Sequence, residues 1–228
     1  MTQKDDMDLS NRLERPPLHR GLSFAYRIYE PSERATHVLV LLHGSGVDET
    51  VLVPLAQASA PDARLVAVRG RIVQDGSRRW FTRITPTEFD QRSIREEADA
   101  FASFLPEVAR REAFDLNEAV TLGYSNGANL ASSVMLFHPS LIRFAVLLRA
   151  MPVLKDEPTP DLHGVHVLVI SGERDTTYGP YAPALRLSLE RCRAVVESHT
   201  AQSGHEFSNY DVNLIRAWLR KSAIAHSA

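Results

Sequence analysis

Residues Gly123-Tyr124-Ser125-Asn126-Gly127 form the stretch that decides the fold, because of what lies on either side of them. An apolar run at 119–122 precedes this G-x-S-x-G pattern, and small and apolar residues follow it at 128–136. This context predicts a strand that turns sharply into a helix, since the glycines let strand and helix approach closely while the serine takes a strained backbone conformation. We expect the Ser125 hydroxyl at a strand end and the Asn126 N–H at a helix N-terminus, where negative charge is favoured.

The rest of the chain alternates between short apolar runs and amphipathic segments. Nearly continuous apolar runs are typical of strands buried on both faces of a parallel sheet. They lie at 38–42, 65–68, 119–122, 144–148 and 165–170, with an alternating edge strand at 24–29. Helices are predicted at 88–111, 126–137, 181–193 and 209–221, with Ser93 and Glu96 as a capping pair for the first. The pattern predicts a single-domain α/β fold, with a mostly parallel central sheet covered by helices on both faces.

Length and composition limit the classes of protein to consider. The chain has 228 residues, a formal net charge of −2 and a pI near 6.5, which favours one domain and argues against nucleic-acid binding. Cys192 is the single cysteine, so no internal disulfide can form, as is usual in a reducing compartment. The acidic start does not resemble a signal peptide, and no apolar run approaches membrane-spanning length. We therefore expect a cytoplasmic protein, with a loosely ordered tail at 1–18 and the folded domain at 19–228; whether it forms a homodimer stays open.

Five arginines and two aromatic residues gather in the polar segment that follows the run at 65–68. The arginines are Arg69, Arg71, Arg78, Arg79 and Arg83. They indicate either a solvated loop or a patch for an anionic substrate. The adjacent aromatics are Trp80 and Phe81. They either anchor the segment to the core or line an acyl or aromatic substrate pocket, and the second alternative makes them candidate substrate-binding residues.

Ser125 needs a base and an orienting carboxylate to act as a nucleophile, because a serine hydroxyl is weakly nucleophilic at neutral pH. In this type of fold the acid and then the histidine follow the serine in the chain. Asp175 ends a buried strand and a glycine-containing turn, which fits the acid; Glu173 is a rival, and a structural turn aspartate is the alternative. His205 follows Gly204 and precedes the last predicted helix, which fits the base, with His199 as the second choice.

The segment His43-Gly44-Ser45-Gly46 follows the run at 38–42 and is the fourth candidate element. Its glycines allow the backbone to approach a substrate carbonyl, so that the N–H of Ser45 can pair with that of Asn126 as an oxyanion hole. His43 is interpreted as a structural residue whose imidazole braces this segment.

These residues together resemble the α/β-hydrolase superfamily, in particular the small carboxylesterase/phospholipase group that contains acyl-protein thioesterases and lies close to dienelactone hydrolases. The similarity runs from about residue 38 to residue 219. It rests on Leu41-Leu42-His43-Gly44-Ser45-Gly46, Val68-Arg69-Gly70, Arg79-Trp80-Phe81, Gly123-Tyr124-Ser125-Asn126-Gly127-Ala128-Asn129, Gly172-Glu173-Arg174-Asp175 and Gly204-His205. The resemblance implies an α/β-hydrolase fold without a large lid, with Ser125 as nucleophile, His205 as base, Asp175 as its orienter, and Ser45 and Asn126 as the oxyanion hole.

The expected activity is hydrolysis of short to medium carboxylic esters through an acyl-enzyme, with a small-molecule ester as substrate and no metal or organic cofactor. A thioesterase, a lysophospholipase, a small lactonase and a non-catalytic ligand-binding protein of the same fold remain alternatives. Two departures bear on this. A serine in place of a cysteine nucleophile makes dienelactone hydrolysis less favoured, and Thr177-Tyr178-Gly179-Pro180 replaces the usual V-P after the acid.

Overall fold

A seven-stranded sheet forms the centre of the protein. The structure is a computed structural model that describes residues 15–226, with side chains described up to Lys221. The strand order is β1-β3-β2-β8-β9-β10-β11, and only β1 is antiparallel to its neighbour. The strands are β1 (Ala25–Tyr29), β2 (His37–Leu42), β3 (Ala63–Arg69), β8 (Val120–Tyr124), β9 (Phe144–Leu148), β10 (His166–Gly172) and β11 (Val195–Ala201). The α/β fold and its mostly parallel sheet are therefore confirmed.

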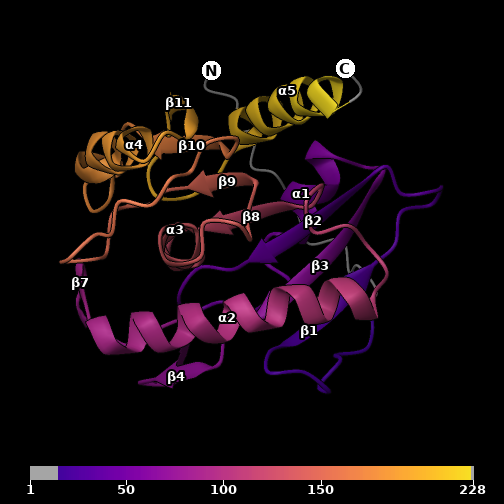
Figure 1. Cartoon of the computed structure of the whole chain (residues 1–228), viewed down its shortest axis with the longest axis horizontal. Helices are drawn as coiled ribbons and strands as arrows, with labels where there is room; N and C mark the ends of the chain where they lie inside the picture. Colours follow the sequence, from indigo (N-terminus) through magenta and orange to yellow (C-terminus); the bar gives the residue numbers. More distant parts are fainter. Residues whose placement is uncertain (1–14, 227–228) are drawn as a thin grey trace, which may run out of the picture.

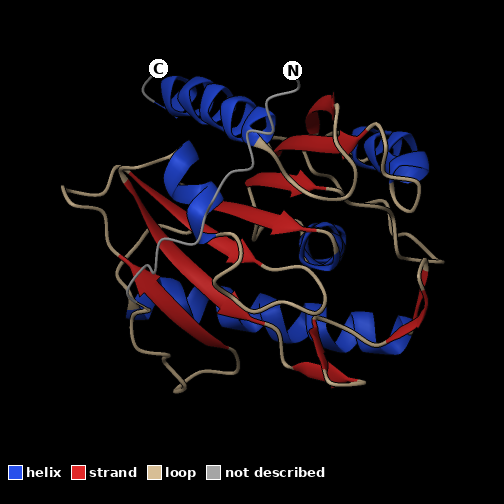
Figure 2. Ribbon diagram, turned by 180° about the vertical axis from the view of Figure 1, so that it is seen from behind, coloured by secondary structure: helices blue, strands red, loops and turns tan. Residues whose placement is uncertain are grey.

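Helices cover both faces of this sheet (Figures 1 and 2). They are α1 (Val53–Ser59), α2 (Gln91–Arg111), α3 (Asn126–Phe137), α4 (Ala182–Arg191) and α5 (Asn209–His226). Side chains alternate along each strand between two hydrophobic clusters. In β2, Val40 and Leu42 pack in the cluster that contains α2, α3 and α4, whereas Leu39 and Leu41 pack in the cluster that contains α1 and α5.

Several elements differ from the sequence-based expectations. The long helix begins at Gln91, because the Asp90 side chain accepts a hydrogen bond from the Ser93 N–H; Ser93 itself lies inside the first turn. The segment expected as a loop between 71 and 91 contains two small hairpins, β4 (Ile72–Gln74) with β5 (Ser77–Arg79) and β6 (Arg83–Thr85) with β7 (Glu88–Phe89). Helix α1 was not predicted from the sequence. Helix α4 is shorter than the predicted 181–193, and α5 extends beyond the predicted 209–221.

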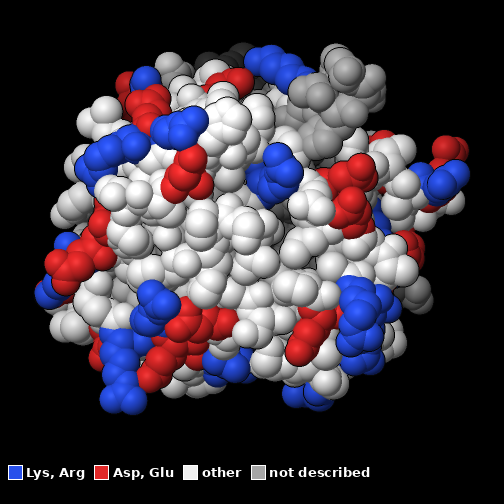
Figure 3. All heavy atoms as spheres, in the orientation of Figure 1, with Lys and Arg blue, Asp and Glu red and all other residues white. Residues whose placement is uncertain are grey.

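Of the tail expected at 1–18, residues 1–14 lie outside the described part of the chain. Charged side chains of both signs are interspersed around one face of the molecule, with a broad uncharged area at its centre (Figure 3). Within residues 15–226, no helix combines the length and the hydropathy that a membrane span requires. The carboxyl ends of β2, β8 and β10 share one edge of the sheet because these strands are parallel. The segments that hold the candidate site residues follow those ends.

Candidate active site

Ser125 occupies the sharp turn between β8 and α3. Its backbone has φ 52° and ψ −117°, a conformation that L-residues rarely adopt, and its N–H donates to the carbonyl of Leu148 at 2.8 Å. A Cβ on Gly123 would lie 2.6 Å from the Cα of Ala128, and one on Gly127 would lie 2.2 Å from the carbonyl oxygen of Leu42. Both glycines are thus required by close backbone packing, and the strained serine is held in place by its surroundings.

Three side chains from separate loops form one line of hydrogen bonds. His205 Nε2 lies 2.9 Å from Ser125 Oγ, and His205 Nδ1 lies 2.7 Å from Asp175 Oδ2. The imidazole is 39% exposed, whereas the Asp175 side chain is 2% exposed. The structure thus brings together the serine, the histidine and the first-choice acid. Glu173 is exposed at the surface, and His199 bonds to Glu197 on β11 instead.

Asp175 is held as an anion by its own loop. Burial alone would raise the pKa of this carboxyl, but the N–H of Tyr178, the His205 side chain and the N–H of Thr177 outweigh burial and lower it. Both N–H groups donate to Asp175 Oδ1 at 3.0 Å. A carboxylate in this state fixes the proton of His205 on Nδ1, which leaves Nε2 as an acceptor toward Ser125.

The loop that carries His205 is fastened by Arg149, a residue that the sequence analysis did not single out. Arg149 follows β9 with φ 50°, and its side chain is fully buried. Its guanidinium forms a bidentate pair with Asp211 at 2.8 and 2.9 Å. It also donates to the carbonyls of Gly204 at 3.1 Å and Glu206 at 2.9 Å, on either side of the histidine. The sequence signal for this role is an arginine directly after an apolar strand, because a charged side chain at such a position must find buried partners.

The segment after β2 runs directly against Ser125. A Cβ on Gly44 would lie 3.6 Å from the Cβ of Ser125, which places Ser45 beside the turn. His43 is buried; its Nε2 accepts from the Gly70 N–H at 3.0 Å, so its Nδ1 carries the proton toward the Gly44 carbonyl, 2.6 Å away. Burial lowers the pKa of this imidazole, which keeps it neutral. His43 therefore braces the segment, as the sequence analysis proposed.

Trp80 and Phe81 do not line a cleft in this structure. Both side chains have 0% exposure and belong to a hydrophobic cluster. Trp80 Nε1 donates to the His43 carbonyl at 2.7 Å, and its backbone N–H donates to the Asn126 side chain at 2.8 Å. The substrate-pocket hypothesis for these two aromatics is corrected: they anchor the hairpin segment to the core, and Trp80 ties it to the turn that holds Ser125.

Two further residues lie near the site: Tyr178, to which the sequence analysis gave no role, and Arg79, one of the five arginines of the basic segment. The Tyr178 ring meets the His205 ring edge-on, with centroids 5.2 Å apart. Burial raises the pKa of its hydroxyl, while the nearby Ser125 side chain and the charges of Arg83 and Arg79 oppose the rise. Arg79 is 5% exposed, and its Nε and Nη1 have no hydrogen-bond partner in the described part of the chain.

Comparisons with known proteins agree on the fold. A carboxylesterase from Mesorhizobium loti is 51% identical in its crystal structure, with a TM-score of 0.88 over 91% of this chain and 99% of that one. The crystal structure of a Bacillus cereus carboxylesterase is 29% identical, with a TM-score of 0.83 over 88% of this chain and 95% of that one. Among curated proteins, the "Putative hydrolase MhqD" of Bacillus subtilis (strain 168) is 28% identical over 198 residues, 86% of this chain and 98% of that protein. No family model matches the chain.

Proposed function

We propose that Ser125 cleaves carboxylic esters of short to medium acyl chain through an acyl-enzyme. The proposal starts from the family: the chain belongs to the α/β-hydrolase superfamily and is an esterase-type hydrolase. The observation that carries this proposal is the continuous line from Asp175 through His205 to Ser125, with distances of 2.7 and 2.9 Å, at a strained turn. A purely ligand-binding protein of this fold has no need for all three groups in this order.

In the proposed reaction, His205 Nε2 takes the proton from Ser125 Oγ as that oxygen attacks the ester carbonyl. The negative charge that develops on the carbonyl oxygen is stabilised by the N–H groups of Ser45 and Asn126, the latter at the free N-terminus of α3. His205 then gives the proton to the departing alcohol. A water molecule, activated by the same imidazole, releases the acid and restores Ser125. Asp175 stays ionised throughout and stabilises the imidazolium.

The proposed acyl length follows from the small number of residues that could cover the site at the carboxyl ends of the strands. Among the described residues, α3 is followed by β9, a loop and β10, with no helical cap between them. The exposed imidazole of His205 is consistent with an open site. Apolar contact contributes about 0.8 kcal/mol per buried methylene until the wall of the site ends. We therefore expect kcat/KM to rise over the first acyl carbons and to level off by about C4 to C8.

A fluorophosphonate probe tests the nucleophile directly. It should label the protein once, at Ser125, and Ser125→Ala should abolish both labelling and turnover of p-nitrophenyl esters with little change in Tm. Ser103→Ala, at an exposed serine on α2, is the matched control and should behave like the wild type. Labelling that persists in Ser125→Ala would refute the assignment. A panel of acyl thioesters and lysophospholipids separates the alternatives, and faster turnover of either than of the best ester would replace the carboxylesterase proposal.

A further inference from the structure

Arg79 is a buried cation whose hydrogen-bonding capacity is not met by the protein. It ends β5, is 5% exposed, and leaves Nε and Nη1 without a partner among the described residues. None of the ion pairs in that part of the chain includes it. Burial lowers the pKa of its guanidinium, the charge of Arg83 lowers it further, and Asp75 and Tyr178 act in the opposite direction. Buried charges in proteins are normally paired, so the missing partner needs an explanation.

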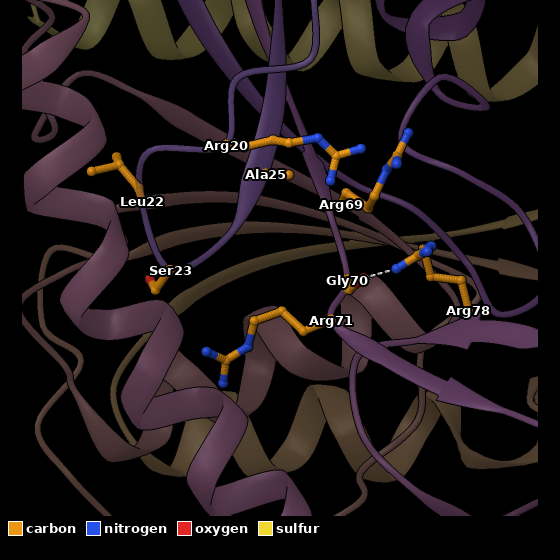
Figure 4. Close-up of a pocket in the computed structure, with 8 residues that line it drawn as sticks. All are labelled: Arg20, Leu22, Ser23, Ala25, Arg69, Gly70, Arg71 and Arg78. Atoms are coloured by element: carbon orange, nitrogen blue, oxygen red, sulfur yellow. Dashed lines mark hydrogen bonds between the residues drawn. The ribbon is translucent and has the colours of Figure 1, made fainter.

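The neighbouring arginines show what a satisfied arginine looks like in the same region. Figure 4 shows Arg69, Arg71 and Arg78, together with Arg20 from the segment before β1, around a pocket of about 260 Å³. There Arg69 pairs with Glu49 at 2.6 and 2.7 Å, and Arg71 pairs with Glu97 at 2.7 and 3.0 Å.

Arg78 donates to the Gly70 carbonyl at 2.9 Å, as Figure 4 also shows. Each member of this group therefore has a partner within the protein. Among the described residues, the five arginines of the basic segment thus divide into three that bond within the protein and two, Arg79 and Arg83, whose side chains do not. Arg83 is exposed and has no carboxylate partner in the described part of the chain.

The position of Arg79 relates it to Ser125. The next residue, Trp80, donates its backbone N–H to the side chain of Asn126, at 2.8 Å, and Asn126 directly follows the serine. From the other side, the Tyr178 ring packs edge-on against His205, with centroids 5.2 Å apart, and its hydroxyl lies within electrostatic reach of both Arg79 and Arg83. Two positive charges therefore lie near a side chain that contacts the proposed base.

We propose that Arg79, assisted by Arg83, binds a carboxylate of the substrate, so that the preferred substrates are esters carrying a second, free carboxylate. A guanidinium can hold a carboxylate through two parallel N–H···O bonds, which supplies the partners that Nε and Nη1 lack. Hemiesters of short dicarboxylic acids present such a group on the acyl side, and acylated hydroxy acids present it on the alcohol side. This inference rests on the proposed ester hydrolysis and names its substrate class.

Two matched substrate pairs test the inference, with acid release followed by titration at constant pH. Monomethyl glutarate is compared with methyl valerate for the acyl side, and O-acetylglycolate is compared with ethyl acetate for the alcohol side. We expect kcat/KM at least about tenfold higher for the charged member of one pair, since a charge-assisted bidentate pair favours it. The pair that shows the preference identifies the side of the ester on which the carboxylate lies.

The variants separate recognition from structure. Arg79→Gln should bring the charged-to-neutral ratio of kcat/KM down to about one or below, and Arg79→Lys should give an intermediate ratio because its charge lacks the planar fork. Arg83→Gln, at an exposed residue that does not support the fold, should lower the ratio about two- to threefold. Arg110→Gln, which removes an exposed charge near the other end of α2, should leave the ratio unchanged.

Binding of glutarate, measured by calorimetry, gives a readout that does not depend on turnover. Wild type should bind it and Arg79→Gln should not. A wild-type protein that hydrolyses both neutral esters faster than their charged partners, or that binds glutarate no better than Arg79→Gln does, overturns the inference while ester hydrolysis stands. Glutarate binding that needs Arg79, without hydrolysis of any ester, would instead overturn the proposed function and keep the carboxylate site.

Discussion

Two buried arginines near the candidate site differ in how completely they are bonded. The guanidinium of Arg149 donates hydrogen bonds to Asp211, to Ser203 and to the backbone carbonyls next to His205. Arg79 leaves two donors without partners. A fully satisfied polar network rigidifies a structure, whereas an unsatisfied buried group is costly. The histidine side is thus completed by the protein itself, whereas the Arg79 side, in our proposal, is completed by the carboxylate that binds there.

The same contrast holds for the loops. The acid and histidine loops touch backbone to backbone, since a Cβ on Gly172 would lie 2.1 Å from the Gly204 carbonyl oxygen. Tyr124 adds a hydrogen bond from its hydroxyl to the His205 carbonyl at 3.1 Å. The hairpin loop that follows Arg79 carries the exposed Arg83 and an Ile84 side chain that is 62% exposed. Substrate selection is therefore expected to depend on the hairpin side and the proton transfer on the histidine side.

The largest expected effect sharpens the histidine side of this comparison. Asp175→Asn should lower kcat by about 10⁴-fold with the fold intact, because an amide no longer fixes the proton of His205 on Nδ1. Glu173→Gln is the matched control two residues away, and should change kcat by less than about threefold because that side chain is exposed. Steady-state kinetics with p-nitrophenyl butyrate measures both. A reversed result would mean that Glu173, not Asp175, orients the base.

The next prediction tests whether Arg149 holds the histidine loop. Arg149→Met leaves Asp211 buried and unpaired, so the free energy of unfolding should fall by about 3–5 kcal/mol. Arg149→Met with Asp211→Leu should recover part of that loss, since neither charge is then buried. Urea unfolding measures the stability of each. If Arg149 also positions His205, the double variant should stay folded but show a lower kcat and a displaced pH profile; a wild-type profile would limit Arg149 to a structural role.

Ser125 and Asp175 could be recognised as candidates from the sequence because each follows a strongly apolar strand, and His205 because it follows Gly204 and precedes the last predicted helix in the expected chain order. Parallel strands bring such positions to one edge without any knowledge of the loops. Ser93 shows the limit of the same reasoning. A capping pair fitted Ser93 and Glu96, but Asp90 lies three residues earlier and its carboxylate reaches the Ser93 N–H. Several residues of one segment can cap, and only the path of the chain decides among them.

The partners of Arg149, the position of Tyr178 and the choice between the two alternatives for Trp80 could not be predicted from the sequence, because they depend on contacts between distant segments. Arg149 bonds Asp211, 62 positions away, and Trp80 bonds His43, 37 positions away. The hairpins around Trp80 are short and polar, so no apolar periodicity revealed them, and an aromatic pair there suited a pocket as well as an anchor. A sequence pattern tells which residues need a partner; the structure decides whether the partner is protein or ligand.

The smallest predicted effect concerns Glu49, which lies in the segment after β2 that also carries Ser45. Its carboxylate is fully buried and pairs with Arg27 and Arg69, each at 2.6 Å. Burial opposes ionisation, but the two arginines outweigh it and lower the pKa of Glu49 from 4.5 to about 2. A depressed folded-state pKa stabilises the protein at pH values above about 4.5, and this contribution is lost as the pH falls toward 2.

Glu49→Gln should therefore reduce the free energy of unfolding by about 2 kcal/mol at pH 7, less than the about 3 kcal/mol that the full shift implies because the two guanidinium groups are partly exposed to solvent. The difference from wild type should shrink below pH 4.5 in urea titrations between pH 7 and pH 3. Glu33→Gln, at an exposed glutamate, should follow the wild type throughout. If the difference in the free energy of unfolding between the wild type and Glu49→Gln stays constant with pH, Glu49 contributes to stability through packing rather than through charge. Such a result would leave the Ser45 segment held mainly by His43 and Trp80.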